Sequence, residues 1–460
     1  MRRHDPRLIL AVVSLASFLL SFDLAGIVVA MPSIRLAFDA TDSQLTWAQN
    51  AFALAGCAAL PLVGVLGDRL GRARVFCAAT VVFMVASAGC ALAGDLAQLT
   101  GWRATQGVAS AAFLAIGTAL LRDVWGADMS RTVGFLTGAG AIGMSLGPVL
   151  GGALVDLASW RTLLVVEAAA GAVLAVAAVA VMLGLPTARR TGLDPVGAGA
   201  ASVAIAAAVI LVHLWQGQSG IGGVVVTGTL PVIGVLAVML ASIALFLRRQ
   251  RTSKSPALPR AVWSSRSFRI MALVGFVAYL GLSSTAFLIS LVAQSVDGWS
   301  ALPVGLIMLP ITIGLVIGTI IGPRLVRRHG QRFVIMLGYS ACAVGTLALL
   351  GLSTNAIGWT AVIVGNAVSG LGAGMASPQA LAYGLGDIDG RDTGAASSWL
   401  WVSRQWGTSL GFALLATIAF GSASLVGGVR VVLIIAAIAF VVSSVISAVT
   451  LRARPTMAVT

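Results

Sequence analysis

Three ionisable side chains lie deep inside apolar stretches of this sequence, where a charge is costly. They are the carboxylates Asp23 and Glu167 and the guanidinium of Arg103. Burial opposes ionisation of a carboxylate and a neighbouring arginine favours it, so a buried acid beside an arginine gains or loses a proton when its surroundings change. Ionisable groups within membrane-spanning segments commonly mark proton or substrate pathways. These residue types therefore predict reversible proton binding.

The same three residues are expected at one depth. Counted at 1.5 Å per residue from the outer ends of their spans, they fall in a layer roughly 9–14 Å below the outer surface. We interpret Asp23 as the main proton-coupling carboxylate, tuned by Arg103, with both facing a water-accessible crevice between two bundles. The alternative is a purely structural ion pair. Glu167 is either an additional proton or cation site or an acid that extends toward the interface.

A second set of polar residues is suited to binding a small molecule. Arg404 lies near mid-depth in its apolar stretch, three positions after Trp401, where it could contact an aromatic or anionic ligand. Asn50, Gln106 and Asn366 are uncharged polar residues within apolar runs. We predict that these five residues line a substrate cavity. Alternatively, Trp401 faces lipid. The alternative for the three amide side chains is that interhelical hydrogen bonds satisfy them.

Composition shows which elements must position these residues. Of 460 residues, 58% are hydrophobic and 10% are charged, and the mean hydropathy is +1.00. Such a chain cannot cover a soluble surface, and its apolar runs are long enough to cross a bilayer as helices. We predict an all-α membrane protein with fourteen transmembrane helices. The predicted spans are residues 8–32, 44–66, 74–94, 96–121, 132–155, 161–185, 196–215, 224–247, 269–293, 301–323, 333–352, 357–384, 394–419 and 430–451.

Basic residues are distributed unequally between the two sides of these spans. With a cytoplasmic N-terminus, 24 of the 29 Lys and Arg fall in cytoplasmic segments and 3 outside, and Arg103 and Arg404 lie inside spans. This asymmetry predicts that both termini are cytoplasmic. It also accounts for the net charge of +14 without nucleic-acid binding. The most basic loop, residues 248–269, either sets topology alone or lies along anionic lipid headgroups.

The sequence lacks the residue clusters that enzymes and metal sites need. Its three histidines, His4, His213 and His329, are far apart along the chain. Its four cysteines fall inside apolar runs without a CxxC pair, which argues against a metal site or a disulfide framework. We therefore predict a protein that is not an enzyme, with no catalytic residues, no metal and no cofactor. No loop is long enough for a sensor domain.

The two halves of the chain contain similar segments at corresponding positions, as in an internal repeat. RTVG at 131–134 and RDTG at 391–394 are 260 residues apart, and each leads into a span that contains glycines. The turn GVLGDRLGRAR at 64–74 is echoed by GPRLVRRHGQR at 322–332. Internal repeats of this kind are typical of secondary transporters. We predict a six-helix bundle at residues 1–190, an extra transmembrane helix pair at 191–255 and a second six-helix bundle at 256–460.

The first of these turns carries a motif of its own. Its glycines permit a tight turn and close helix contact, and its aspartate can cap a helix start or pair with a nearby arginine. A plain turn that only sets topology is the alternative. The motif residues are Gly64, Asp68, Arg69, Gly71 and Arg72.

A second motif lies in the span 132–155, which reads GFLTGAGAIGMSLGPVLGG over residues 134–152. Two of its glycines, four positions apart, form a GxxxG contact face. The proline that follows removes a backbone hydrogen bond and permits a bend. The residues singled out are Gly143, Gly147, Pro148, Gly151 and Gly152.

These motifs resemble those of the major facilitator superfamily, specifically its fourteen-helix drug:proton antiporter family. The turn at 64–74 is similar to the superfamily signature G-x-L-x-D-R-x-G-R-[KR], and residues 134–152 are similar to an antiporter pattern, G-x8-G-x3-G-P-x2-G-G. LTGWRATQG at 99–107 resembles L-x-x-x-R-x-x-Q-G. SFDLAGIVVAMPSI at 21–34 resembles L-D-x-T-x-x-N-x-A-L-P-x-I, although the threonine and asparagine positions are apolar here.

The resemblance implies a major facilitator fold and a function. That function is export of small, lipophilic or drug-like molecules in exchange for protons by alternating access, with the 64–74 turn as a latch between halves. The alternative cargo is an endogenous metabolite such as an amino acid, a siderophore or an antibiotic. The spans after residue 269 contain no acid, which weakens the case for a cationic cargo.

The expected partners are the lipid bilayer, protons and a small-molecule substrate, with no nucleic acid. The monomer is expected to be functional. The expected location is the bacterial inner membrane, where such an exporter would contribute to antibiotic resistance.

Overall fold

The computed structural model describes most of the chain, apart from both ends and several loops. It also leaves out some side chains inside helices, including that of Asn50. The described residues are 5–40, 42–125, 129–182, 184–185, 194–215, 220–221, 224–225, 229–295, 298–299, 301–351, 356–389, 392–420, 422 and 424–451.

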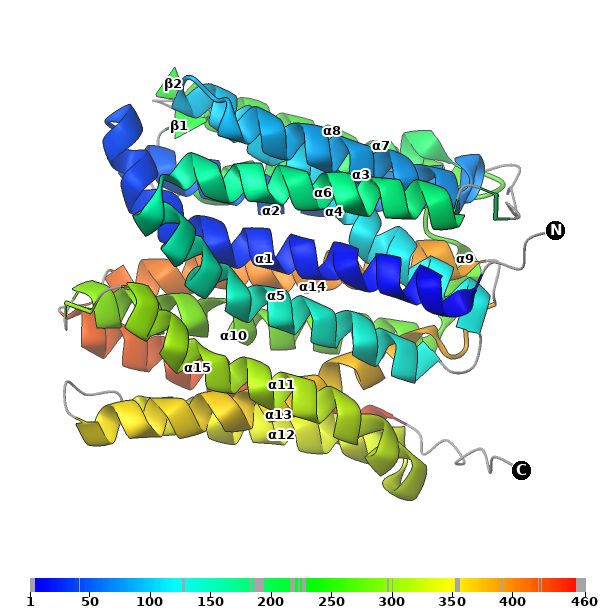
Figure 1. The fold of residues 1–460 in the computed structure, drawn as a ribbon. Helices are drawn as coiled ribbons and strands as arrows, with labels where there is room; N and C mark the ends of the chain where they lie inside the picture. The colour runs from blue at the N-terminus through cyan, green and yellow to red at the C-terminus, as the bar shows by residue number, and fades with distance from the viewer. Residues whose placement is uncertain are drawn as a thin grey trace. The chain divides into compact units, whose positions relative to one another are not determined.

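Long helices make up nearly all of the described chain (Figure 1). Helices satisfy their backbone hydrogen bonds internally, which is the requirement that a bilayer imposes on a spanning segment. The described residues contain fourteen helices of 18 or more residues, and eleven of them are long and apolar enough over their described parts to cross a membrane. The predicted all-α membrane fold is thereby confirmed.

The ends of these long helices differ from those of the predicted spans by at most six residues. The helices are α1 (Pro6–Phe38), α2 (Asp42–Leu70), α3 (Arg72–Ala91), α4 (Leu96–Trp125), α5 (Met129–Leu157), α6 (Trp160–Met182), α7 (Pro195–Trp215), α8 (Thr229–Thr252), α10 (Arg266–Ser295), α11 (Ala301–His329), α12 (Gln331–Ala348), α13 (Ala356–Leu385), α14 (Thr393–Phe420) and α15 (Leu425–Thr450). Most of them are longer than predicted, whereas α3, α6 and α12 end earlier and α8 begins later. The short elements are β1 (Gly220–Ile221), β2 (Val224–Val225), α9 (Arg260–Ser264) and the 3₁₀ turn η2 (Leu349–Gly351). The two strands pair in an antiparallel hairpin.

The chain forms two compact units. Unit 1 consists of residues 1–126, 146–263 and 389–402, and unit 2 of residues 127–145, 264–388 and 403–460. Helices α5 and α14 therefore each contribute residues to both units. The division into 1–190, 191–255 and 256–460 that the sequence suggests remains a prediction.

The two units use the same pattern of helix pairing. In unit 1, α4 packs against α1, α2 and α3, and α6 packs against α1 and α3. In unit 2, α13 packs against α10, α11 and α12, and α15 packs against α10 and α12. The second pattern reproduces the first when α1, α2, α3, α4 and α6 are matched to α10, α11, α12, α13 and α15. The helix pairing is thus repeated in the two units, as the similar segments in the two halves of the sequence are.

Glycines set the closest helix crossings in both units. A Cβ on Gly107 of α4 would lie 2.0 Å from the backbone oxygen of Phe52 in α2. At the matching crossing in unit 2, a Cβ on Gly374 of α13 would lie 2.1 Å from the backbone oxygen of Leu315 in α11. No side chain fits at either point, so small residues bring the helix backbones together, as is usual in membrane bundles.

Helices α7 and α8 pack against each other, and α7 also packs on α2. Asp194 caps α7 by accepting a hydrogen bond from the Gly197 amide at 2.9 Å, and Pro195 occupies the first helical position, where its missing N–H is not needed. The buried Asp194 also pairs with Arg249 of α8, with Nη2 and Oδ1 2.9 Å apart. The most apolar part of α8 has no buried residue, which suits a helix that contacts lipid.

Candidate functional site

The three intramembrane charges meet inside unit 1. Asp23 comes from α1, Arg103 from α4 and Glu167 from α6, and their exposed fractions are 0%, 1% and 1%. Together with Gln106 of α4 and Cys90 of α3 they form what we call the buried charge cluster. Helix pairing explains the meeting, because α1 packs on both α4 and α6 while α3 also packs on both.

Arg103 is held on several sides. Its Nη1 donates to Asp23 Oδ1 at 2.5 Å and to Gln106 Oε1 at 2.9 Å. Gln106 Nε2 in turn donates to Ser87 Oγ at 2.8 Å on α3. The guanidinium also lies over the Phe52 ring of α2, 4.7 Å from its centre. The position of Arg103 therefore depends on α1, α2 and α3 at once.

Glu167 is the least satisfied member of the buried charge cluster. Neither of its carboxyl oxygens has a hydrogen-bond partner among the described residues, and the same is true of Asp23 Oδ2. Glu167 lies close enough to Asp23 and to Arg103 to interact with both electrostatically. Two carboxyl groups thus share one arginine. The alternative in which Glu167 extends toward the interface does not apply to this conformation.

Solvent access differs from the sequence-based expectation. Asp23 and Arg103 were expected to face a water-accessible crevice, yet both are buried among helices of unit 1. The expectation is therefore wrong for this conformation. The physical reason is close packing, because Leu99, Leu163 and Leu164 belong to the apolar cluster around this layer and are each fully buried.

The antiporter-type glycines lie directly beside Asp23. A Cβ on Gly147 of α5 would lie 2.8 Å from the Phe22 backbone oxygen and 2.9 Å from the Gly26 backbone nitrogen. A Cβ on Gly151 would lie 3.2 Å from Gly26 Cα. This part of α5 therefore touches the α1 backbone on either side of Asp23. Among the other motif residues, Gly143 and Gly152 are buried, Pro148 is half-buried and continues α5, and a Cβ on Gly152 would meet Val29 at an ordinary 3.5 Å.

The predicted turn motif forms a second polar cluster, at the junction of α2 and α3. Gly71 is the N-cap residue of α3 and has a φ of +102°, a conformation that favours glycine. Asp68 accepts from Arg72 Nε at 3.0 Å, and Arg72 Nη1 reaches both oxygens of Asp123 on α4, at 2.6 and 2.7 Å. Arg72 thus links three helices, whereas Arg69 is exposed.

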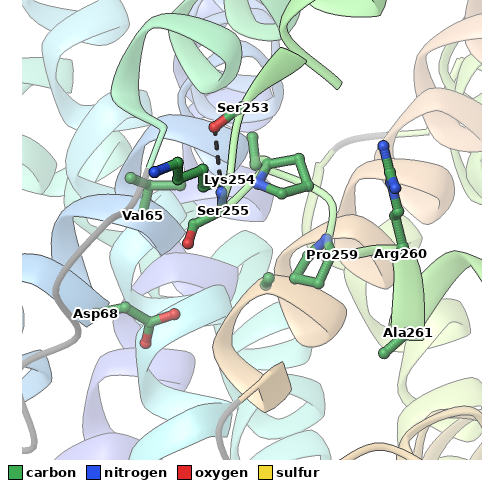
Figure 2. Close-up of a pocket in the computed structure, with 11 residues that line it drawn as sticks. Val65, Asp68, Ser253, Lys254, Ser255, Pro259, Arg260 and Ala261 are labelled. Carbon is green, nitrogen blue, oxygen red and sulfur yellow. Dashed lines mark hydrogen bonds between the residues drawn. The ribbon is translucent and has the colours of Figure 1, made fainter. Parts of the chain in front are cut away.

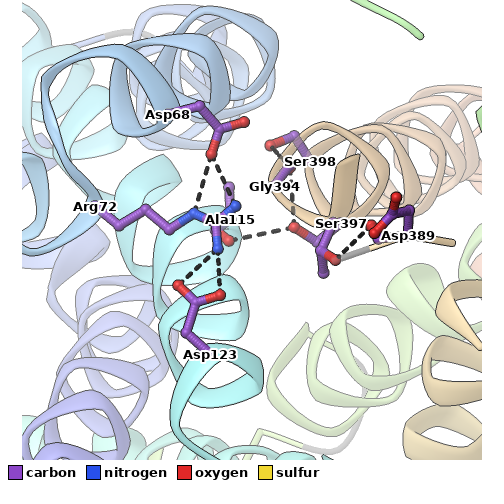
Figure 3. Close-up of polar contacts among 9 residues, drawn as sticks. Asp68, Arg72, Ala115, Asp123, Asp389, Gly394, Ser397 and Ser398 are labelled. Carbon is purple, nitrogen blue, oxygen red and sulfur yellow. Dashed lines mark hydrogen bonds and ion pairs between the residues drawn. The ribbon is translucent and has the colours of Figure 1, made fainter. Parts of the chain in front are cut away.

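The Asp68 carboxylate also lies against the first turn of α14 (Figure 3). A Cβ on Gly394 would lie 2.6 Å from Asp68 Oδ1, so only glycine permits this approach. A Cβ on Gly64 would similarly lie 2.2 Å from Ser398 Oγ. A helix N-terminus carries partial positive charge, which favours a carboxylate there. The contact between α2 and α14 is what we call the turn contact.

A cavity of about 380 Å³ adjoins the turn contact. Its lining comes from α2, from Ala395 of α14, from the loop after α8 and from the start of α9. It includes the Asp68 carboxylate and the chain's single lysine, Lys254 (Figure 2). Ser255 and Arg260 complete its polar lining with the neighbouring Ser253. The cavity therefore carries charges of both signs.

Unit 2 contains its own buried arginine. Arg404 of α14 has an exposed fraction of 3% and donates through Nη2 to the Ser377 backbone oxygen at 3.0 Å. Its guanidinium lies 5.3 Å from the centre of the Tyr279 ring, and the Tyr279 hydroxyl lies 3.0 Å from Ser377 Oγ. Tyr279 was not predicted, although a tyrosine inside the apolar run of span 269–293 carries a hydroxyl group that needs a partner within the membrane.

The other residues predicted to line a substrate cavity have varied surroundings. Gln106 belongs to the buried charge cluster. Asn366 of α13 donates to the Ile307 backbone oxygen of α11 at 3.2 Å, which is the interhelical hydrogen bond named as the alternative. Trp401 donates through Nε1 to Thr118 Oγ1 at 3.3 Å within unit 1. Asn50 lies outside the described side chains.

Sequence reasoning missed two partners in these clusters. Asp123 was not singled out, although it follows Arg122 at the end of span 96–121, on the side where the 64–74 turn must lie. Ser87 was also missed, because a serine in an apolar run carries no signal of its own. The topology could have indicated Asp123, whereas nothing in the sequence indicates Ser87.

Fold and buried charges together define a multi-pass membrane transporter. A sequence model described as the Major Facilitator Superfamily matches residues 13–412, and the chain belongs to this superfamily. Two solved structures share the fold: the human organic anion transporter MFSD10 (TM-score 0.69) and the proton:xylose symporter XylE (TM-score 0.68). Each is 14% identical, and both alignments cover 96% of this chain, with 99% and 94% of the other chain.

Several proteins similar in sequence to this chain are named as drug efflux, multidrug transport or antibiotic resistance proteins. It is 28% identical over 417 residues to the drug efflux pump JefA of Mycobacterium tuberculosis, covering 90% of this chain and 80% of JefA. It is 26% identical to the methylenomycin A resistance protein of Bacillus subtilis, covering 91% and 89%. The match to the Bacillus subtilis multidrug transporter protein MdtP, also 28% identical, covers 73% of this chain and 61% of that protein. The resemblance to multidrug efflux members is thereby confirmed.

Proposed function

We propose that this protein is a proton-coupled exporter of small, lipophilic or drug-like molecules that works by alternating access. The single observation that supports the proposal most is the Asp23–Arg103 ion pair, buried with a second carboxylate inside a repeated transporter fold. The names of relatives at 26–28% identity point to drugs as cargo. An endogenous metabolite would be carried by the same mechanism.

The coupling step is a change in one ion pair. When Asp23 takes up a proton, it loses the charge that holds Arg103 Nη1, and the guanidinium keeps its bond to Gln106. When Asp23 loses the proton, the pair re-forms. Because the cluster is closed in this conformation, proton exchange requires another state in which water reaches Asp23. Glu167 adds a second carboxylate to the same step.

Helix α5 is suited to transmit this change. Its glycines contact the α1 backbone on both sides of Asp23, and Pro148 weakens the helix at the same level. A bend in α5 therefore displaces the backbone that carries the proton site. We assign Gly143, Gly147, Pro148, Gly151 and Gly152 to this transmission.

The turn contact is assigned the role of a latch. Asp68, held by Arg72, stabilises the N-terminus of α14 in this conformation, and the contact breaks when α14 moves away. A carboxylate at a helix N-terminus contributes about 0.3–1 kcal/mol, which is suitable for a contact that must form and break in every cycle.

For the cargo path we retain the residues that the sequence suggests: Asn50, Gln106, Asn366, Trp401 and Arg404. We further propose a bacterial inner-membrane location with cytoplasmic termini, and function as a monomer. Protons, lipid and the cargo are the partners. No step in this proposal needs a metal, a cofactor or a catalytic residue.

The test is a panel of drugs in a bacterium that lacks its own efflux pumps. Expression of the protein is expected to lower accumulation of at least one drug, and an uncoupler that collapses the proton gradient is expected to restore it. Export that persists unchanged with the uncoupler would contradict proton coupling. Unchanged accumulation of every drug would favour a metabolite as cargo, to be sought by comparing the metabolites released by cells with and without the protein.

A further inference from the structure

The turn between α11 and α12 in unit 2 matches the turn between α2 and α3 in unit 1, but its charge is reversed. Each turn ends in a glycine with positive φ, +102° at Gly71 before α3 and +83° at Gly330 before α12. Three positions before the glycine, unit 1 has Asp68 and unit 2 has Arg327. The turn of unit 2 thus has a cation where that of unit 1 has an acid.

The surroundings of the two turns differ in the same direction. In unit 1, Arg72 pairs with Asp68 at 2.9 Å and with Asp123 at 2.6 Å. In unit 2, residues 324–332 carry four arginines and one histidine, and helices α10–α15 contain no Asp or Glu. None of these five basic side chains forms an ion pair with a described residue. An anion that balances this turn must therefore come from outside these helices.

Three of the arginines lie on one face of α11. Arg324, Arg327 and Arg328 are three and four positions apart, so their side chains are neighbours on the helix surface, and all three are exposed. Like charges at this spacing repel each other. One anion between them removes that repulsion, and the planar guanidinium group matches the geometry of a phosphate.

An apolar strip leads along α11 directly to these arginines. Ile313, Ile317 and Ile320 have exposed fractions of 57%, 41% and 52%. Their spacing of four and three positions continues to Arg324 and Arg327, so all five residues follow one face of the helix. The matching helix of unit 1, α2, has no such strip, because none of its side chains between residues 51 and 68 is exposed.

The length of α11 places the two parts of this face at different depths of a bilayer. Its membrane-spanning part, Pro303–His329, has 27 residues and so extends over about 40 Å. This is the thickness of a bilayer with its headgroups. The isoleucines therefore lie beside acyl chains, and the arginines at the end of the helix lie among headgroups.

We propose that this face of α11 binds an anionic phospholipid. Its phosphate and charged headgroup bind the three arginines, and one acyl chain lies along the three isoleucines. We call this site the α11 lipid face; it consists of Ile313, Ile317, Ile320, Arg324, Arg327 and Arg328. A zwitterionic lipid cannot balance the three charges, and free phosphate leaves the isoleucines unused. The site does not depend on the proposed transport function.

Native mass spectrometry of the full-length protein in detergent tests the site directly. The protein is titrated with phosphatidylglycerol, which is anionic, with phosphatidylcholine, which is zwitterionic, and with inorganic phosphate. Bound phosphatidylglycerol is expected at lower concentration than bound phosphatidylcholine, and no bound phosphate is expected. Phosphatidylcholine that binds equally well overturns the anionic headgroup. Phosphate that binds as tightly as the lipid makes the arginines a site for a soluble anion and overturns the lipid.

The matched variants each remove three exposed arginines. Arg324→Gln/Arg327→Gln/Arg328→Gln alters the α11 lipid face, and Arg7→Gln/Arg74→Gln/Arg266→Gln alters three separate helix starts. Each basic side chain near an anionic surface strengthens binding by about fivefold, so the first variant is expected to bind phosphatidylglycerol at least about tenfold more weakly. The second is expected to keep wild-type binding. Equal losses in both variants, or no loss in the first, overturn the site.

Hydrogen exchange on the wild-type protein covers the case in which the glutamine variant does not fold. The protein is placed in nanodiscs of phosphatidylcholine alone or mixed with phosphatidylglycerol. The anionic lipid is expected to slow backbone exchange over residues 324–333 and to leave the matching turn at 68–75 unchanged. Unchanged exchange at both turns overturns the proposal. Equal slowing at both turns overturns it as well, because the lipid then acts through overall charge.

Discussion

Among the described residues, each unit buries one arginine, and these two arginines are held in different ways. Arg103 in unit 1 meets the Asp23 carboxyl group, an amide and a phenylalanine ring. Arg404 in unit 2 donates to a backbone carbonyl and lies against a tyrosine ring, and helices α10–α15 contain no Asp or Glu. Protonation can remove the main partner of Arg103, whereas no proton can remove a backbone carbonyl. In the proposed mechanism, unit 1 is therefore the proton-sensitive half, and Arg404 provides a fixed positive charge.

The largest expected effect comes from removing the arginine of the proton-sensitive unit. Arg103→Gln leaves two carboxyl groups buried without a cation, which is expected to lower the free energy of unfolding by about 3–5 kcal/mol. Arg404→Gln is the matched variant and is expected to cost about 1–3 kcal/mol, because it leaves one carbonyl unsatisfied. Thermal unfolding of the detergent-purified proteins measures both. Equal losses in the two variants would contradict the comparison.

Asp23→Asn is expected to remove proton coupling while keeping the fold. The asparagine oxygen still accepts from Arg103, but the side chain can no longer gain or lose a proton. Efflux driven by a pH jump in everted vesicles is expected to disappear, with thermal unfolding close to that of the wild type. Arg404→Gln should change the rate of efflux but not its dependence on pH. Full pH-driven efflux by Asp23→Asn would rule out its assigned role.

Sequence patterns predicted most of the fold because bilayer thickness fixes helix length and charge asymmetry fixes how the spans alternate. They also placed Asp23, Arg103 and Glu167 at one depth, since depth follows from counting residues along a helix. They could not give the rotation of each helix about its axis. The proximity of Asp23 to Glu167, and the bond from Asn366 to Ile307, depend on that rotation.

The sequence also could not show that the buried charge cluster is closed to water in this conformation. A transporter sequence must be compatible with more than one packing, and the spacing of residues does not say which packing is populated. The same limit applies to the turn contact, where Gly394 was seen only as part of a repeat and not as the place where Asp68 meets α14. The sequence identified the motif residues from their residue types and spacing. Their contact partners could be identified only in the structure.

A smaller effect is expected at the glycine that contacts α1 beside Asp23. Gly147→Ala puts a methyl group 2.8 Å from the Phe22 backbone oxygen and 2.9 Å from Ala25 Cβ, so α5 and α1 must move apart. Such overpacking costs about 1–3 kcal/mol. We expect slower pH-driven efflux together with a lower melting temperature. Gly152→Ala is the control in the same helix, because its methyl group would meet Val29 at 3.5 Å without strain.

The smallest effect is expected at Gly394. Its substitution tests whether the turn contact controls the transport cycle or only stabilises unit 1. Gly394→Ala places a methyl group 2.6 Å from Asp68 Oδ1 and so weakens the approach of that carboxylate to the α14 N-terminus. The lost interaction of about 0.3–1 kcal/mol is of the same size as the gain in helix propensity from glycine to alanine, so the melting temperature should change little. The equilibrium between states should still shift by about two- to fivefold, because only the state with the turn contact is destabilised.

The measurement compares the melting temperature and the efflux rate of Gly394→Ala with those of Gly101→Ala, whose methyl group meets nothing within 4 Å. An effect on the transport cycle changes the efflux rate, whereas an effect on stability changes the melting temperature. A large drop in melting temperature with an unchanged rate would make the turn contact a structural element of unit 1, and the proton-sensitive unit would then have to communicate with α14 by another route.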